Sequence, residues 1–247
     1  MLPFYNASFH AVDVLHRDKH VLAVNKPPGV LAQPDHTGDP DVLSRAKRLL
    51  GGTDSDPFLG LVHRLDRPAS GVMVLARTSE AAAHLSRQFR ERTAEKRYLV
   101  LVEGRLRGLG TWTDYIAKPG RRPRLVPPEH PDGKRAVLDW QALATADART
   151  LLQIILRTGR PHQIRLQATS RGHPVMGDER YGAEASLGKR ALALHHSLLR
   201  LDHPAHPRRN TFTSAPPPAW ASALTDEMHS AIRRVLDQAH PSAPSSS

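Results

Sequence analysis

Short apolar runs, separated by Gly, Pro, Asn and Asp, recur along the chain. Runs of this kind bounded by turn residues are typical of strands, and few polar residues between two runs favour an antiparallel pair. The runs 11–15 and 20–25 flank the turn 17–19 and are expected to be neighbouring strands. The runs 136–143 and 151–156 are expected to pair with each other. The predicted strands span 11–15, 20–25, 59–65, 72–76, 97–102, 136–143, 151–156, 192–201 and 210–214.

Four other segments carry apolar residues three or four positions apart, which is the spacing of one helix face. The second segment begins at Thr78 or Ser79, either of which can cap it, and the third is expected to have Pro161 at its first position. The predicted helices run from 42 to 51, from 79 onward, from 161 to about 171, and along 220–235.

Strands with single helices between them, without regular alternation, predict an α+β architecture on a mixed, largely antiparallel sheet with flanking helices and loops. Proline-rich stretches fall inside loops rather than between two halves, so residues 1–240 are expected to form one domain. The Ser/Pro tail 241–247 is predicted to be disordered.

Composition narrows the class of protein. The chain has 247 residues and no cysteine, which excludes disulfide scaffolds, thiolate metal sites and cysteine nucleophiles. No apolar run approaches the roughly 20 residues of a membrane span, and the first ten residues lack the pattern of a secretory signal. We therefore expect no membrane association and a cytoplasmic location.

Charge points to the partner. Lys and Arg number 35 against 24 Asp and Glu, which gives a net charge of +11 and a pI near 10.6. Arginine predominates, and its planar fork of donors suits phosphate and stacking on bases, so nucleic acid is a candidate partner. The alternative is that arginine usage follows the base composition of the coding DNA. The basic segment 104–135, with Arg121, Arg122 and Arg124, is expected to be loop and sheet edge.

Three segments could carry chemistry. Asp66 follows the predicted strand 59–65 and precedes a Pro/Gly turn, a position that suits a catalytic carboxylate, although it could equally cap the turn. A helix from Pro161 would place His162 and Arg165 on one face, where Arg165 could reach a carboxylate or simply meet solvent. Tyr98 stands in an aliphatic strand, either as a functional aromatic or as core.

Together these segments form a specific pattern. Residues 25–29 read Asn-Lys-Pro-Pro-Gly, and 63–71 read His-Arg-Leu-Asp-x-x-x-Ser-Gly. Residues 95–104 read Glu-Lys-Arg-Tyr-Leu-x-Leu-Val-x-Gly, and 157–165 read Arg-Thr-Gly-Arg-x-His-Gln-Ile-Arg. In this order and spacing they resemble the motifs of the RluA-type pseudouridine synthases, and the resemblance covers roughly residues 12–220.

The resemblance implies an isomerase that detaches uracil from C1′ of a uridine in RNA, turns it, and rejoins it through C5. It assigns Asp66 as the carboxylate beside C1′ and Arg165 as its ion-pair partner. Tyr98 would stack on the uracil and take the C5 proton. Whether Asp66 attacks C1′ or removes the 2′ proton stays open. Since nothing is oxidised and no phosphate is consumed, we expect neither cofactor nor metal.

The implied partner is structured RNA, either 23S ribosomal RNA or transfer RNA, bound by a monomer. The target nucleotide would flip out of its stack, and Arg64 would fill the vacated space. No room precedes Asn25 for the S4 RNA-binding module of many relatives, so an S4-less member is expected. The residues expected to contact RNA are Lys26, His63, Arg64, Arg160, His162, Gln163, Arg121, Arg122 and Arg124.

The chain departs from the family pattern at Ala69, Pro161 and Gln167, where Thr, Thr and His are usual. None of these carries the implied chemistry, so they affect fine geometry only. The alternatives to an active enzyme are a catalytically inactive RNA-binding protein and a glycosidase with Asp178 as a second carboxylate. A further alternative is a metal site built from His195, His196, His203 and His206.

Overall fold

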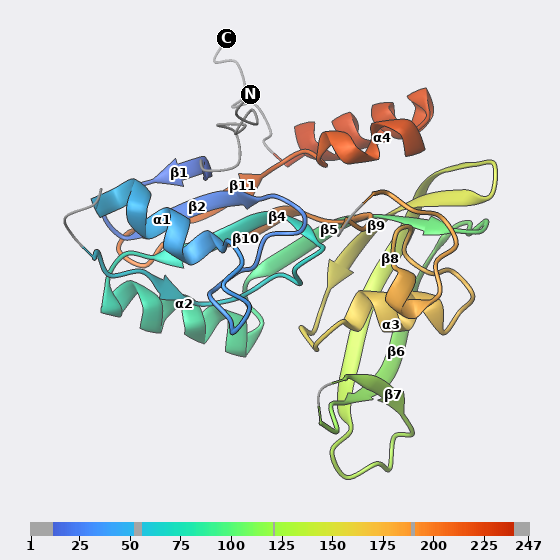
Figure 1. Ribbon diagram of the computed structural model, residues 1–247, viewed down its shortest axis with the longest axis horizontal. Helices are drawn as coiled ribbons and strands as arrows, with labels where there is room; N and C mark the ends of the chain where they lie inside the picture. Colours follow the sequence, from blue (N-terminus) through green and yellow to red (C-terminus); the bar gives the residue numbers. More distant parts are fainter. Residues whose placement is uncertain (1–11, 52–55, 121, 189–190, 240–247) are drawn as a thin grey trace, which may run out of the picture.

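The strands lie in one twisted sheet that crosses the whole molecule, with helices against it (Figure 1). This computed structural model describes residues 12–51, 56–120, 122–188 and 191–239. The strands are β1 Asp13–Arg17, β2 Val21–Lys26, β3 Gly60–Leu61, β4 Ser70–Ala76, β5 Glu95–Glu103, β6 Leu109–Ala117, β7 Arg124–Val126, β8 Lys134–Ala146, β9 Arg149–Leu156, β10 Leu194–Asp202 and β11 Arg209–Thr213. The helices are α1 Val42–Gly51, α2 Ser79–Glu91, α3 Gln163–Thr169 and α4 Asp226–Asp237, with short 3₁₀ helices η2 Glu179–Tyr181 and η3 Pro218–Ala223.

The strand order is β1-β2-β4-β10-β5-β9-β8-β6-β7, with β3 also on β4 and β11 also on β10. The β4–β10 pair is parallel, whereas the other pairs between named strands in the described residues are antiparallel. The predicted α+β class on a mixed, largely antiparallel sheet is therefore confirmed.

The central strands are buried on both faces, which explains their nearly continuous apolar sequences. In β2, Leu22 and Val24 pack in the core cluster that includes α1. The alternate residues Val21 and Ala23 pack in the cluster that includes Leu85 of α2. Strand β4 divides its side chains between the same two clusters. The sheet is thus a rigid platform from which loops can present functional groups.

Two histidines replace a missing strand along one edge of β4. On that edge, residues 70–71 of β4 pair with β10 and residues 75–76 pair with β3. Residues 72–74 between them have no strand partner on this side. There the Val74 N–H donates to His63 Nε2 at 3.0 Å, and His196 Nδ1 donates to the Val72 carbonyl at 2.7 Å. Because side chains complete the hydrogen bonds, the chain can leave the sheet after β3 and carry Asp66 toward the centre of the molecule.

Gly71 permits the close crossing of β4 and β10. Its φ is +115°, and a Cβ at this position would lie 2.4 Å from the His196 carbonyl oxygen. Only glycine fits such an approach. The neighbouring Ser70 hydroxyl lies 2.9 Å from His195 Nδ1. Ser70 and Gly71, which end the motif 63–71, therefore fix the start of β4 against β10, directly after the turn that carries Asp66.

Three predicted elements differ from the structure. The strand predicted over 59–65 is paired only at Gly60–Leu61, so Asp66 lies in a turn before β4 rather than at a strand end. Helix α3 begins at Gln163, two residues after Pro161. The apolar stripe 220–235 is two helices, because Leu224 is extended and Thr225 caps α4 by accepting from the Met228 N–H.

The basic segment 104–135 contains more strand than predicted. It includes β6 and β7, which form the far edge of the sheet together with the start of β8. In Figure 1 this end of the sheet packs against α3 and extends past it as an arm. Arg122 and Arg124 are exposed on it, whereas Arg121 lies outside the described residues. The predicted tail 241–247 and Ala11 also lie outside them.

Candidate active site

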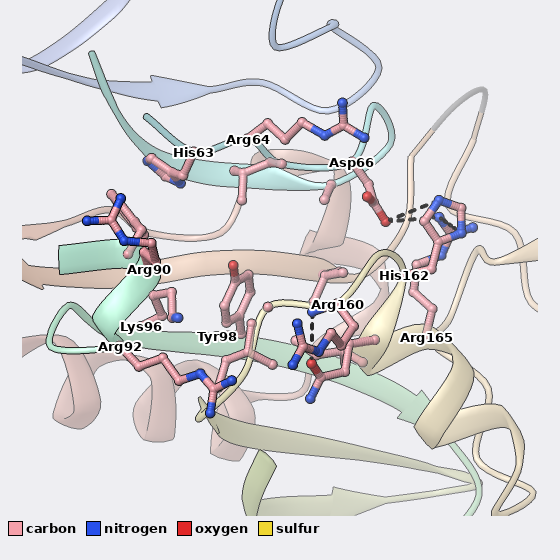
Figure 2. Close-up of a pocket in the computed structure, with 18 residues that line it drawn as sticks. His63, Arg64, Asp66, Arg90, Arg92, Lys96, Tyr98, Arg160, His162 and Arg165 are labelled. Carbon is pink, nitrogen blue, oxygen red and sulfur yellow. Dashed lines mark hydrogen bonds and ion pairs between the residues drawn. The ribbon is translucent and has the colours of Figure 1, made fainter. Parts of the chain in front are cut away.

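A chain of ion pairs holds Asp66, and Figure 2 shows the first of them, from Asp66 to Arg165, with His162 beside it. Arg165 Nη1, from α3, lies 3.1 Å from Asp66 Oδ2. The same guanidinium grips Asp178 in a bidentate pair, with Nε–Oδ2 at 2.6 Å and Nη2–Oδ1 at 2.7 Å. The Arg165 and Asp178 side chains are 5% and 1% exposed, against 27% for Asp66. Asp178 thus fixes the arginine, and the arginine orients a carboxylate that stays accessible.

Electrostatics keeps this arrangement charged. Burial opposes the charge of Arg165, but the hydrogen bonds and ion pair with Asp178, with a further contribution from Asp66, outweigh it and raise the pKa of Arg165. Arg165 is therefore a permanently cationic partner of Asp66. The Arg165 guanidinium also lies over the Tyr181 ring, 4.9 Å from its centroid, which further restricts its position.

His162 sits beside the carboxylate because the backbone turns sharply there. It is the N-cap of α3 with φ of +52°, a left-handed conformation that is unfavourable for histidine. Its Nε2 lies 3.9 Å from Asp66 Oδ2 and its Nδ1 is 2.8 Å from the Tyr181 hydroxyl. Burial lowers the pKa of His162 more than the Asp66 charge raises it, so the imidazole is neutral at pH 7. Strained residues of this kind cluster at functional sites.

Tyr98 projects from β5 into the space in front of Asp66 (Figure 2). One face of its ring stacks on His196 of β10, with centroids 4.5 Å apart and planes at 18°. Burial raises the pKa of the Tyr98 phenol well above its usual value, and the Asp66 charge adds to the shift. Tyr98 is therefore a neutral, fixed aromatic surface.

These groups line a cavity of about 460 Å³. A second cavity of about 550 Å³ adjoins it, and both are lined by Arg64, Asp66, His162 and Arg165. Among the residues that line the first cavity, Asp66 is the one acidic side chain. The basic residues there are Arg64, Arg90, Arg92, Lys96, Arg160 and Arg165. The cavity combines an aromatic wall, one carboxylate and a strong excess of positive charge, which suits an anionic ligand with a planar ring.

Comparison with known proteins decides the class. The family model described as RNA pseudouridylate synthase matches residues 20–170. The chain belongs to the RNA pseudouridine synthase family. The RluA-type resemblance and the expectation of an isomerase that acts on RNA are thereby confirmed.

Individual relatives agree with this family. Ribosomal large subunit pseudouridine synthase D of Nitrosomonas europaea is 33% identical over 243 residues, which cover 93% of this chain and 67% of the relative. The dual-specificity RNA pseudouridine synthase RluA of Haemophilus influenzae is 33% identical over 213 residues, 82% of this chain and 92% of the relative. The chain spans 62% of the synthase D of Xylella fastidiosa.

The structure of human RNA pseudouridylate synthase domain containing 4 shares the fold. It superposes with a TM-score of 0.69 at 24% identity, covering 90% of this chain and 93% of the human chain. Within the described residues, no helix is long and apolar enough to span a membrane.

Two residues that we expected to bind RNA do not face the cavity as free donors. Lys26 is completely buried, and its Nζ donates to the carbonyls of Pro27, Arg67 and Ala69 at 3.0, 2.9 and 2.7 Å. Burial lowers its pKa to about 7, while the charge of Asp66 opposes this shift. The prediction that Lys26 holds a backbone phosphate is wrong, because all three of its donors fix the turn that carries Asp66.

Gln163 is likewise an internal residue, 3% exposed. Its side-chain oxygen accepts from the Thr158 hydroxyl at 2.7 Å and from the Arg160 N–H at 3.0 Å. Its amide donates to Gln167 Oε1 at 3.1 Å. Gln163 also lines the first cavity, so its expected RNA contact stays a prediction, although its polar atoms already shape the loop before α3.

The other predicted RNA-binding residues keep at least one surface toward the cavity or solvent. Arg64 is exposed and lines both cavities. Arg160 lines the first cavity while its Nε donates to the Arg135 carbonyl at 3.0 Å. His63 also lines it, but its ring stacks on Phe89 at 4.5 Å and accepts from β4, so its role is mainly structural.

The alternative sites are not formed. Both oxygens of Asp178 are bound to Arg165, so it is not free to act as the second acid of a glycosidase. His195 contacts Ser70 and Ser214, while His196 contacts Val72 and Tyr98. Within the described ranges, no group of three or more His, Cys, Asp or Glu side chains could hold a metal ion.

Sequence reasoning missed two residues that line the cavity, Arg90 and Arg92, and one that supports its Tyr98 wall, His196. Arg90 lies in the last turn of α2 and Arg92 is its C-cap, and neither belongs to one of the four motifs. His196 supports Tyr98 from a strand almost a hundred residues further along the chain. Of these, only Arg92 could have been found from the sequence. The helix predicted from residue 79 has neither glycine nor proline where it ends, so another residue must take the C-cap position there.

Proposed function

We propose that this protein isomerises specific uridines in structured RNA to pseudouridine, with Asp66 as the catalytic carboxylate. The observation that carries the proposal is the fixed relation of Asp66, Arg165 and Tyr98 around one cavity. Uracil is a planar ring of the size that an aromatic wall can hold, and the phosphates of RNA match the basic surroundings. Family membership supports the same reaction.

Asp66 acts at C1′ of the flipped nucleotide. It either attacks C1′ to displace uracil or removes the 2′ proton, and both routes need an ionised carboxylate held in one orientation. Arg165 supplies the opposite charge, and Asp178 keeps Arg165 from swinging away. The exposed fraction of Asp66, 27%, lets a ribose approach it.

Tyr98 stacks on the uracil while the base is detached and turned. Its pKa, raised mainly by burial and further by the charge of Asp66, keeps the phenol protonated, so it is a poor base for the C5 proton. The resemblance implied both stacking and proton transfer, and the structure favours stacking in the resting protein. The cavity that His162 lines holds the separated base and sugar together, which limits their reaction with water.

Asp66→Asn is the deciding variant. Pseudouridine is counted at single-nucleotide resolution in total ribosomal and transfer RNA incubated with the wild-type protein, with Asp66→Asn, and with Asp56→Asn as the control. Asp56 is an exposed aspartate with a side chain 79% accessible, so the control makes the same chemical change away from the cavity.

We expect wild type and Asp56→Asn to form pseudouridine at the same positions, and Asp66→Asn to bind RNA normally but lose turnover by more than about a thousandfold. Turnover of Asp66→Asn within tenfold of wild type would refute the assignment. RNA binding by the wild type without any pseudouridine formed would instead favour the inactive RNA-binding protein.

A further inference from the structure

A second group of charges lies in the same cavity, away from the catalytic carboxylate. Figure 2 shows Arg92 and Lys96 on one side of Tyr98 and Asp66 on the other, with Arg160 between them below the ring. All line the first cavity. They come from the C-cap of α2, from β5 and from the loop before α3. We call Arg92, Lys96 and Arg160 the cationic end of the cavity.

These cations have no anionic partner of their own. In the described part of the chain, neither Arg92 nor Lys96 forms an ion pair with a carboxylate, and the side-chain hydrogen bond of Arg160 goes to the Arg135 carbonyl. Lys96 is only 8% exposed. Burial lowers the pKa values of Lys96 and Arg160, and the charge of Arg92 lowers both further. Lys96 is therefore a buried ammonium beside another cation, an arrangement that is unfavourable unless an anion joins them.

The backbone at Arg92 adds an independent observation. Arg92 adopts φ of +64° and ψ of +28°, the left-handed C-cap conformation for which glycine is the favoured residue. Its N–H closes the helix on the Gln88 carbonyl, a bond that needs no particular side chain. Arginine at this position is therefore not explained by the fold, and its side chain reaches the cavity.

We propose that Arg92, Lys96 and Arg160 bind a phosphodiester group of the RNA strand that adjoins the nucleotide presented to Tyr98 and Asp66. The inference rests on the proposed function and makes it more specific. Arginine forks match the two free oxygens of a phosphodiester, and lysine adds a point charge. The cavity would then recognise base and backbone together, so the substrate is a nucleotide within a strand rather than a free nucleoside.

The inference is tested by binding, without turnover. The probes are uridine, uridine 5′-monophosphate and uridine 3′-monophosphate, titrated by calorimetry or NMR. The variants are Lys96→Gln and Arg92→Gly, and the matched control is Arg87→Gln, an exposed cation of α2 that does not line the cavity.

For wild type and Arg87→Gln we expect one of the two monophosphates to bind at least about tenfold more tightly than uridine, as one charged hydrogen bond would give. Lys96→Gln and Arg92→Gly should reduce this preference to about threefold or less. Arg92→Gly should melt at or above the wild-type temperature, because glycine suits the left-handed backbone. If Arg92 only supported the fold, Arg92→Gly could not keep its melting temperature and at the same time lose the preference for a monophosphate over uridine.

Two results would overturn the phosphate subsite. One is equal binding of uridine and both monophosphates by wild type, and the other is an unchanged preference in both variants. The pseudouridine assay separates this inference from the function on which it rests. Pseudouridine formation without phosphate preference would remove the subsite alone, whereas phosphate preference without pseudouridine formation would leave the subsite standing and refute the reaction.

Discussion

At the scale of single residues, Lys26 shows how a buried charge can organise the turn that carries Asp66. Its ammonium donates to three carbonyls, two of which belong to the loop 67–69 just after Asp66. Lys26→Met removes the donors and leaves these carbonyls unsatisfied inside the protein. We expect the free energy of unfolding to fall by about 3 kcal/mol and kcat to fall by about 10- to 100-fold, since the Asp66 turn loosens.

Urea unfolding and single-turnover rates measure these two effects. Lys19→Met, a change at an exposed lysine, is the control and should alter neither. If Lys26→Met proves as stable and as active as wild type, the lysine does not position the turn. A variant that binds RNA more weakly but keeps its turnover would return Lys26 to the role of phosphate ligand.

The same residue shows where prediction from sequence stops. The motifs correctly placed Asp66 and Arg165 in contact and Tyr98 in the same cavity, because each motif carries its own chemistry. Lys26 was misassigned because nothing in the local sequence marks a polar side chain at the end of a strand as buried. Two of its partners lie far along the chain, at the carbonyl of Arg67 and at that of Ala69, which is 43 positions away.

At the scale of elements, periodicity identified most strands and helices, and the errors have local causes. The apolar run 59–65 resembles a strand, but His63 and His196 occupy the edge of β4 that it would pair with. Helix α3 begins after Pro161 because Gln163 binds the preceding loop and turns His162 into the left-handed region. In both cases a side chain forms the hydrogen bond that a backbone group of a strand or helix would otherwise form. The spacing of apolar residues carries no information about such bonds.

The arm formed by β6, β7 and the start of β8 is the element we expect to hold RNA outside the cavity. Arg122 and Arg124 are exposed there. If each neutralises one phosphate, Arg122→Gln/Arg124→Gln should reduce the slope of log K against log salt by about 1.4–1.8. KM for structured RNA should rise and kcat should change little, because backbone contacts position the substrate without taking part in chemistry.

Filter binding over a range of salt concentrations measures this slope. Arg233→Gln/Arg234→Gln, on the exposed side of α4, makes the same change in net charge and is the control. An unchanged slope in the arm variant would show that the arm does not touch RNA. An equal change in both variants would indicate a diffuse effect of net charge rather than contacts on the arm.

At the scale of the whole molecule, the site depends on pairings between distant segments. The parallel contact of β4 with β10 joins residues 70–71 to 195–196 and places His196 behind Tyr98. The α+β class follows from the order of elements, but this crossing does not, since nothing in the sequence says which strands become neighbours. The cationic end of the cavity follows from the same assembly, as Arg92 and Arg160 meet only when α2 and α3 are brought to one cavity.

This assembly also buries histidines in their neutral form, which should make the fold sensitive to acid. Burial lowers the pKa of His63 to about 3 and that of His195 to about 4. Both stay unprotonated in the folded state, whereas in the unfolded chain they take up protons below about pH 6.5. The unfolded state therefore binds more protons between these limits, and stability is fully present above pH 6.5 and falls as the pH drops.

Each of these histidines should lower the free energy of unfolding by about 1–2 kcal/mol between pH 7 and pH 5, a range in which ordinary carboxylates remain ionised. Urea unfolding at the two pH values measures the loss. His195→Gln should be less stable at pH 7, because its bonds to Ser70 and Ser214 are weakened, but should lose about 1–2 kcal/mol less on acidification than wild type. His36→Gln, at an exposed position, should keep the wild-type dependence. Equal pH dependence in His195→Gln and wild type would mean that His195 is not held neutral by burial, and the acid sensitivity would then have to come from other groups.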